Sequence, residues 1–379
     1  MKFLFLPALS NSVSRWNPGG IASAQYAGPT PRRTNSVLQK LRVPNWMDEE
    51  LKGTSAYYPH TLSTYYYFRH KALKLPEDAY VFGDSGGFSI IRYGMSRPDG
   101  AAHQRLLDPV DVLQWQASLC DVGVVLDVPP VDRWGQRMWE EALSTTLKNI
   151  KRALPRYEAL RQDKHAFRWW GVVHGWTQED LETWWHRVSA IYPFAGESEG
   201  WVFKARDSSS NPLAVSRCLR FIRRRRLTRI HFLAAAAPGA VVTMLVLGPR
   251  AGIHFISSDA ESGGKLARNR KIIIPTQDGL SNTYLAERGE GREVRDYLFR
   301  QCACLSCEQL REDAERWPDV VGGEYNEYWT HRFAFHNQIA YCQLMLNLER
   351  EAKSSNPDVL LRDVLGSSYG ATLRAFGGS

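Results

Sequence analysis

Short runs of apolar, β-branched and aromatic residues recur along this chain of 379 residues and alternate with segments of helical pattern. Strands of nearly continuous apolar character are typical of parallel sheets, because helices cover both faces of such a sheet. The runs lie at residues 3–6, 80–82, 122–126, 169–173, 201–203, 230–233 and 253–256. Strands that alternate with helices predict repeated βα units, and hence an α/β protein built on a parallel sheet.

Two helix starts and one apolar tract fit this prediction. Asp108-Pro109 is suited to begin a helix, and Thr177 with Asp180 forms a capping box before a second one. The long apolar tract 230–248 is interrupted by Pro238-Gly239, which favours a strand, a turn and a helix over a membrane span. We therefore expect no transmembrane helix and no membrane partner.

Polar residues suited to chemistry stand at or just after the ends of five apolar runs. They are Asp84, Asp127, His174, Lys204 and Asp259. In a TIM barrel the catalytic groups gather at this end of the strands. An open doubly wound sheet would usually carry a glycine-rich phosphate turn after its first strand, and Asn17-Pro18-Gly19-Gly20 lacks that spacing. The pattern predicts a (β/α)8 TIM barrel.

A cysteine cluster late in the chain predicts a metal site. Cys302, Cys304 and Cys307 are followed by His336, which gives four ligands with spacing suited to tetrahedral zinc. Four protein ligands leave no position for an activated water, so we expect the zinc to be structural. The predicted domains are a barrel at 1–298, a zinc-binding subdomain at 299–352, and a loosely packed tail at 353–379, which is rich in Ser, Asn and Gly.

The other three cysteines, Cys120, Cys218 and Cys342, show no paired spacing. Such use of cysteine for metal binding rather than disulfides is typical of a reducing compartment, which predicts a cytoplasmic location.

A formal net charge of +8 favours a polyanionic partner. Basic residues are concentrated in two places. Lys265, Arg268 and Arg270 lie in a glycine-containing loop after residue 256 and are candidates for nucleic-acid binding. The densest run, Arg223 to Arg226, is better explained as a solvated helix end stabilised by the helix dipole.

The three strand-end aspartates fit a glycosyl transfer. Such a reaction needs one carboxylate to attack the sugar carbon and an acid/base to protonate the leaving group. Asp84 precedes Ser85-Gly86-Gly87, and glycine there would allow a planar base to approach the backbone. Taken alone, each aspartate is better explained as a helix cap or a turn stabiliser, but three in equivalent positions favour a role in chemistry. For His174, contact with a base and a structural hydrogen bond at a strand end remain equally open.

In these residues the chain resembles the tRNA-guanine transglycosylase superfamily, over roughly residues 80–345. Asp84 to Phe88 matches the family's DSGGF motif, and the cysteine cluster with His336-Asn337 matches its zinc ligands. The segment from Gln116 to Asp127, the strand ending in His174-Gly175, and the strand ending in Asp259 with the basic residues after it are similar to the family's base-recognition and nucleophile segments.

Two departures from the family pattern concern the substrate. His174 stands where the family usually has glutamine, and Lys204-Ala205 stands where members acting on tRNA have a glycine-rich strand end. The chain is therefore closer to the DpdA-like branch, the 7-deazaguanine DNA transglycosylases, which exchange guanine in DNA for 7-cyano-7-deazaguanine (preQ0).

The resemblance implies a role for each matching residue. Asp259 would be the nucleophile that forms a covalent aspartyl-deoxyribose intermediate, and Asp84 the general acid/base. The base-binding residues would be Asp127, His174, Gly175, Ser85, Gly86 and Lys204. The implied partners are DNA, a 7-deazaguanine base such as preQ0, and possible accessory DNA-modification proteins. Three alternatives remain: an enzyme acting on tRNA, a non-catalytic zinc-containing subunit, and a zinc-dependent hydrolase.

Overall fold

The computed structural model describes the greater part of the chain. The described residues are 1–8, 22–23, 46–47, 51–69, 72–73, 75–87, 107–130, 135–163, 166–191, 200–205, 211–260, 266–267, 272–275, 283–285, 297–316, 327–354 and 356–377.

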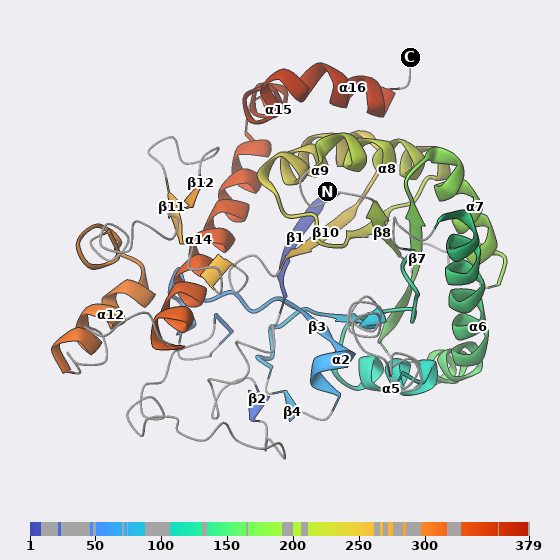
Figure 1. The fold of residues 1–379 in the computed structure, drawn as a ribbon, viewed down its shortest axis with the longest axis horizontal. Coiled ribbons are helices and arrows are strands. Elements are labelled where there is room, and N and C mark those ends of the chain that lie inside the picture. The colour runs from blue at the N-terminus through green and yellow to red at the C-terminus, as the bar shows by residue number, and fades with distance from the viewer. Residues whose placement is uncertain are drawn as a thin grey trace.

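Eight parallel strands form a barrel (Figure 1). In chain order they are β1 (Lys2–Pro7), β3 (Thr61–Thr64), β5 (Val81–Asp84), β6 (Val122–Val124), β7 (Arg168–Gly175), β8 (Trp201–Ala205), β9 (Arg229–Phe232) and β10 (Phe255–Ala260). Neighbours in the sheet are neighbours in the chain, and β1 pairs with β10. A parallel bridge between Ala8 and Leu62 brings β1 to β3, and Thr61 Oγ1 donates to Pro7 O at 2.7 Å, so the ring is nearly closed. The predicted TIM-barrel class is confirmed.

Seven of the strands overlap the seven apolar runs, whereas β3 was not predicted. Its sequence, Thr-Leu-Ser-Thr, is mostly polar, yet all four residues are buried. Hydrogen bonds rather than apolar side chains account for part of that burial, since Thr61 bonds to β1 across the closure. A search for apolar runs cannot detect a strand of this kind.

Helices follow most of the strands and surround the barrel. They are α2 (Tyr65–Phe68), α5 (Pro109–Leu119), α6 (Gly135–Gln162), α7 (Gln178–Ser189), α8 (Pro212–Arg225) and α9 (Pro238–Arg250). Asp108 accepts from Val110 N at the start of α5, and Thr177 and Asp180 form the capping box of α7, as predicted. The tract 230–248 is a strand, a turn and a helix. In the described part of the chain, no helix is long and apolar enough to cross a membrane.

Aromatic rings fill the middle of the barrel. The Phe82 ring stacks on His231 with centroids 4.2 Å apart, and it meets Trp170 edge-on at 5.5 Å. Side chains two positions apart on a strand face the same way. Residues that share the alternation of Phe82 and Trp170, among them Asp84 and His174, therefore point into the barrel.

The segment after the barrel includes a π-helical turn η3 (Tyr297–Gln301), α12 (Leu305–Arg316), α14 (Glu327–Ala352) and the hairpin β11 (Ile273–Pro275) and β12 (Thr283–Leu285). A second short pair joins β2 (Ala22–Ser23) to β4 (Ala72–Leu73). Helix α14 packs on α9 and β1. Its Tyr341 donates to Ala236 O and lies 5.4 Å from the Phe5 ring, which attaches this subdomain to the barrel.

The prediction of a loosely packed tail was wrong. Residues after 355 form α15 (Pro357–Leu365), the 3-10 turn η4 (Gly366–Ser368) and α16 (Tyr369–Gly377), which pack on α9 and α8. The Leu361 side chain is fully buried. The residues that suggested a loop are helix caps: Asn356 accepts from Val359 N before Pro357, and Gly366 ends α15 with a positive φ of 51°.

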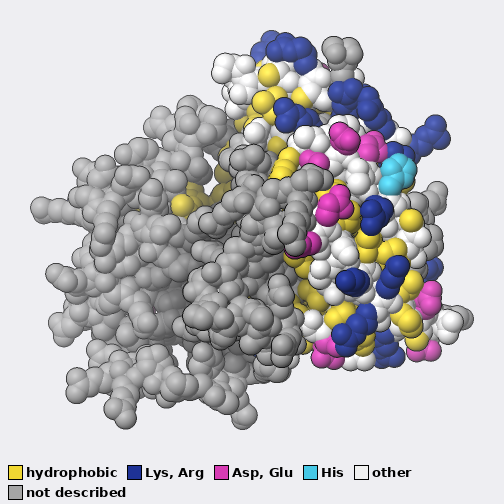
Figure 2. Space-filling model, turned by 45° about the vertical axis from the view of Figure 1, so that its right-hand side comes forward, with side chains coloured by type: hydrophobic (Ala, Val, Ile, Leu, Met, Phe, Trp, Pro, Cys, Tyr) yellow, Lys and Arg dark blue, Asp and Glu magenta, His cyan; other side chains and the backbone are white. Residues whose placement is uncertain are grey.

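The run Arg223 to Arg226 forms the end of α8, as predicted. Arg223 donates to Phe376 O at 3.3 Å and lies 4.5 Å from the Phe376 ring. Arg225 pairs with Glu182 and lies over the Trp185 ring. Figure 2 shows that, on the face it turns to the viewer, cationic side chains are interspersed with carboxylates and apolar groups. Arg223 and Arg225 of this run therefore contribute to helix packing, whereas Arg224 and Arg226 are exposed.

Candidate active site and metal centre

The barrel brings the predicted polar residues to one end. Asp84 is the last residue of β5, Asp259 lies near the end of β10, and Asp127 follows β6. The charges of Asp127 and Asp259 both act on Asp84. Three carboxylates from separate strands thus share one site at the carboxyl ends of the strands, where barrel enzymes place their chemistry.

Asp84 is the carboxyl group most altered by this site. Burial raises its pKa from 3.8 to about 7, and the negative charges of Asp127 and Asp259 add to the rise. The Thr64 side chain and the Gly86 amide, which donates to Asp84 Oδ2 at 3.2 Å, oppose it. A carboxyl group with a pKa near 7 exchanges protons readily at neutral pH, which suits a general acid/base.

Asp127 is held by hydrogen bonds on both of its oxygens. Ser85 Oγ donates to Oδ1 at 3.0 Å, and His174 Nε2 lies 2.7 Å from Oδ2. All three side chains are buried, with Ser85 and His174 exposed by 0% and 2%. Ser85 therefore orients Asp127, and its predicted contact with a substrate stays a prediction. His174 has the structural hydrogen bond that was one of its two predicted roles.

Three glycines of the site, Gly86, Gly87 and Gly175, stand where a side chain would be strained or would clash with the protein's own backbone. Gly86 has a φ of +82°, which disfavours any residue with a side chain, and a Cβ on Gly87 would lie 2.2 Å from Asp127 O. A Cβ on Gly175 would lie 2.7 Å from Leu181 N at the start of α7. These glycines allow close approach of the protein's own backbone, and their contact with a base remains a prediction.

Asp259 is held by groups that the sequence analysis missed. His231 Nε2 lies 3.2 Å and Ala234 N 2.7 Å from Asp259 Oδ1, and His231 Nδ1 lies 2.9 Å from Ser257 Oγ. His231 is fully buried. Ala234 has a φ of +54°, a strained conformation for alanine that presents its amide to Asp259. Within the described residues, both contacts fall on Oδ1, which leaves Oδ2 for reaction.

A signal for His231 was present in the sequence. It is a polar residue inside an apolar run, but the run alone does not show which face of the strand is turned inward. Its partner on β10 could be found only once the register was known, and there Ser257 is paired with His231.

Of the remaining predicted residues, the structure describes Lys204. Lys204 is half-buried, with Nζ 3.5 Å from Leu233 O. Phe88 and the candidate nucleic-acid contacts Lys265, Arg268 and Arg270 lie outside the described residues.

The four predicted metal ligands come together at the start of α12 and in α14. Cys302, Cys304, Cys307 and His336 place their ligand atoms within 4.8 Å of one another. The Sγ atoms lie 3.6, 3.3 and 3.4 Å from His336 Nδ1. Tetrahedral zinc with Zn–S near 2.3 Å and Zn–N near 2.05 Å would separate S and N by about 3.6 Å. The donor set and its spacing therefore fit zinc.

Groups around the ligands fix their orientation. His336 Nε2 lies 2.8 Å from Ile273 O, so its Nδ1 faces the cysteines. The neighbouring Asn337, which is fully buried, accepts from Ile273 N at 2.7 Å. Arg311 donates to Cys302 O at 3.0 Å. The site is thus built into the packing of α12, α14 and β11.

The fold and the sites together define an α/β barrel with a Cys3His centre after its last strand. No model of a known protein family matches the sequence, and no curated protein matches it either.

Proposed function

We propose that the protein is a base-exchange transglycosylase that replaces guanine in DNA with a 7-deazaguanine such as preQ0. One observation carries the proposal: three inward carboxylates from separate strands have different environments. Asp84 has a pKa near 7, whereas Asp259 is fixed by hydrogen bonds on one oxygen. A base exchange needs this pair, namely a proton carrier and a positioned nucleophile.

In the proposed reaction the target guanosine leaves the base stack and enters the mouth of the barrel, because its glycosidic carbon is shielded in a duplex. Asp259 Oδ2 attacks C1′ and forms an ester as the C1′–N9 bond breaks. Asp84 gives its proton to the departing guanine. It then takes the N9 proton of the incoming base, whose N9 attacks C1′ and releases Asp259.

Asp127 is suited to recognise the base. The edge of guanine carries N–H donors, and an ionised carboxylate is an acceptor for them. Ser85 and His174 hold Asp127 in one orientation, so a base would meet a preformed acceptor rather than a mobile side chain. We assign Gly86, Gly175 and Lys204 to the surroundings of the bound base.

We assign zinc a structural role. Cys302, Cys304, Cys307 and His336 would hold it, and when bound it would join α12 to α14. The strand-end aspartates are not among these ligands, which weakens the hydrolase alternative, in which a metal would activate water beside them. The presence of all three aspartates also weakens the alternative of a non-catalytic subunit.

The test is incorporation of labelled guanine or preQ0 by purified protein into matched duplex DNA and unmodified tRNA. We expect label in DNA, and none with Asp259→Ala or with Asp259→Asn, which keeps the size of the side chain. Label in tRNA alone would replace DNA by tRNA as the substrate.

Asp108→Asn is a suitable control, because Asp108 caps α5 outside the site. Exchange by Asp259→Ala at the wild-type rate would remove Asp259 as the nucleophile. Failure of the wild-type protein on both nucleic acids, with zinc bound and the fold intact, would count against the proposal.

A further inference from the structure

A cavity with cationic and aromatic side chains in its lining lies at the opposite end of the barrel from the aspartates. It has a volume of about 640 Å³ and is lined by residues at the amino ends of the strands. Lys2, Arg168 and Arg229 are the first residues of β1, β7 and β9, and Phe255 is the first of β10. Ligand pockets commonly have volumes of about 300–1,000 Å³. The cavity is therefore of a size to hold a small molecule.

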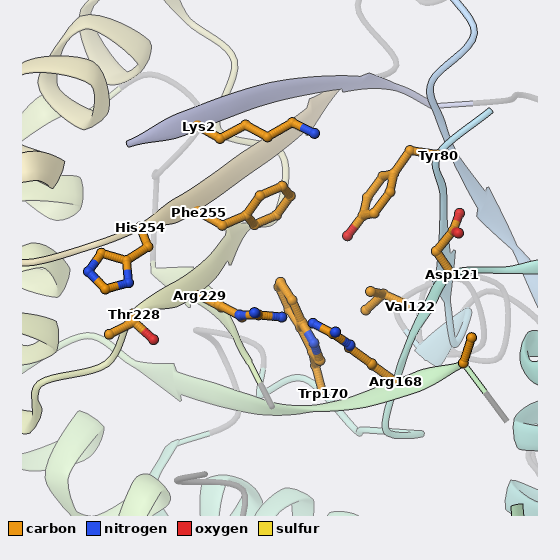
Figure 3. Close-up of a pocket in the computed structure, with 11 residues that line it drawn as sticks. Lys2, Tyr80, Asp121, Val122, Arg168, Trp170, Thr228, Arg229, His254 and Phe255 are labelled. Atoms are coloured by element: carbon orange, nitrogen blue, oxygen red, sulfur yellow. The ribbon is translucent and has the colours of Figure 1, made fainter. Parts of the chain in front are cut away.

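Three cationic side chains point into this space from different strands. Figure 3 shows Arg168 and Arg229 directed toward each other over Trp170, with the amino group of Lys2 and the hydroxyl of Tyr80 on the other side. Among the described residues, none of the three cations forms an ion pair with a carboxylate. One carboxylate, Asp121, also lines the cavity; it accepts a hydrogen bond from Val81 N at 2.8 Å, and its charge acts on Tyr80.

Neutral donors add to the cations. Trp170 is 1% exposed and lines the cavity, and its Nε1 has no hydrogen-bond partner in the described part of the chain. A Cβ on Gly200 would lie 2.3 Å from the Trp170 ring, so this glycine makes room for the indole. Burial raises the pKa of Tyr80 well above its usual value, so its hydroxyl stays protonated and can donate. Trp170 Nε1 and the Tyr80 hydroxyl can therefore donate hydrogen bonds to a ligand in the cavity.

From this convergence we infer that the amino end of the barrel binds a small phosphate-bearing molecule. A phosphate has several oxygens, and these match two guanidinium groups and an ammonium group that approach from separate sides. A carboxylate, by contrast, would occupy a single guanidinium fork. Tyr80, Trp170 and Phe255 supply an apolar wall beside it. The Phe82, Trp170 and His231 layer separates this cavity from Asp84 and Asp259, so the inference does not depend on the proposed exchange reaction.

The test is calorimetric titration of the full-length zinc-loaded protein at constant ionic strength. Inorganic phosphate and thymidine monophosphate are the probes, and thymidine is the control that lacks phosphate. Thymine is not the base of the proposed reaction, so binding at the aspartates is avoided. We expect saturable binding of both phosphates. Tighter binding of the nucleotide would identify an organic phosphate as the ligand, and equal binding would identify free phosphate.

Arg168→Gln and Arg229→Gln should each weaken phosphate binding about tenfold or more, because each removes a charge-assisted contact. Arg224→Gln is the matched control, since Arg224 is exposed at the end of α8. Circular dichroism and zinc content establish that each variant is folded. The inference is overturned if no saturable binding occurs, if thymidine binds as tightly as its phosphate, or if folded Arg168→Gln and Arg229→Gln bind phosphate like the wild type.

Discussion

At the scale of single residues, the ionisation of Asp84 links the site to the stability of the protein. Its folded-state pKa of about 7 lies above the unfolded value of 3.8. The folded state therefore holds this proton more tightly, and stability from Asp84 is full below pH 4 and is lost as the pH rises to about 7.

Asp84→Asn should remove this loss. Between pH 4 and 7 the free energy of unfolding of the wild type should fall relative to the variant, by at most about 4 kcal/mol, because one pKa unit corresponds to about 1.4 kcal/mol. Urea denaturation at a series of pH values measures the difference. Parallel curves for the two proteins would show that Asp84 has an ordinary pKa.

His231 is the residue through which the position of Asp259 can be changed without altering the carboxylate. His231→Leu removes one of the two donors to Oδ1 and leaves Ala234 N, and we expect kcat for base exchange to fall about 10- to 100-fold, since a misplaced group costs rate rather than affinity. His231→Gln can place an amide N–H where Nε2 stands, and it should recover part of the rate. Equal losses in the two variants would indicate a packing role beside Phe82 instead.

The sequence predicts some of these residues better than others. Asp84, Asp127 and Asp259 follow apolar runs, and in a barrel the residues that follow the strands meet at one end. His231, Lys2, Arg168 and Arg229 were overlooked as site residues because they lie inside or at the starts of the runs. Their partners depend on which strands are adjacent and in which register, and those relations arise only when the ring closes.

At the scale of elements, some strands can be predicted from their own sequence, whereas one strand and the caps of α15 cannot. Apolar runs predicted seven strands, but Thr61–Thr64 is buried through the closure of the ring, which its own sequence does not reveal. The Ser, Asn and Gly content of 353–379 suggests a loose tail, yet two of these residues, Asn356 and Gly366, begin and end α15. Ser, Asn and Gly are common to loops and helix caps, so composition alone cannot separate the two.

Helices α15 and α16 should therefore contribute to stability. Leu361 is fully buried where α15 packs on α9, and Leu361→Ala should lower the free energy of unfolding by about 2–5 kcal/mol. Val359 lies on the same helix and is 42% exposed, so Val359→Ala should change it by about 0.5 kcal/mol or less. Chemical denaturation compares the two. A neutral Leu361→Ala would indicate that the tail does not pack on the barrel in solution.

At the scale of the whole molecule, α14 joins the two parts of the protein. Within this helix, His336 belongs to the metal centre, and Tyr341, five residues further on, packs on Phe5 of β1 and bonds to Ala236 before α9. Helix α14 thus connects the metal centre to the first strand of the barrel, which lies between β3 and β10 at the closure of the ring.

Loss of zinc should accordingly lower the stability of the barrel as well as that of the subdomain. Cys304→Ser removes one ligand, and we expect a fall in bound zinc and in the melting temperature, with hydrogen exchange increased first in α12 and α14 and then in β1, because binding free energy at such a site is folding free energy. Cys218→Ser is the matched control, since Cys218 is buried in α8 outside the cluster. It should keep its zinc. Full zinc loss with unchanged exchange in β1 would show that α14 does not couple the metal centre to the barrel.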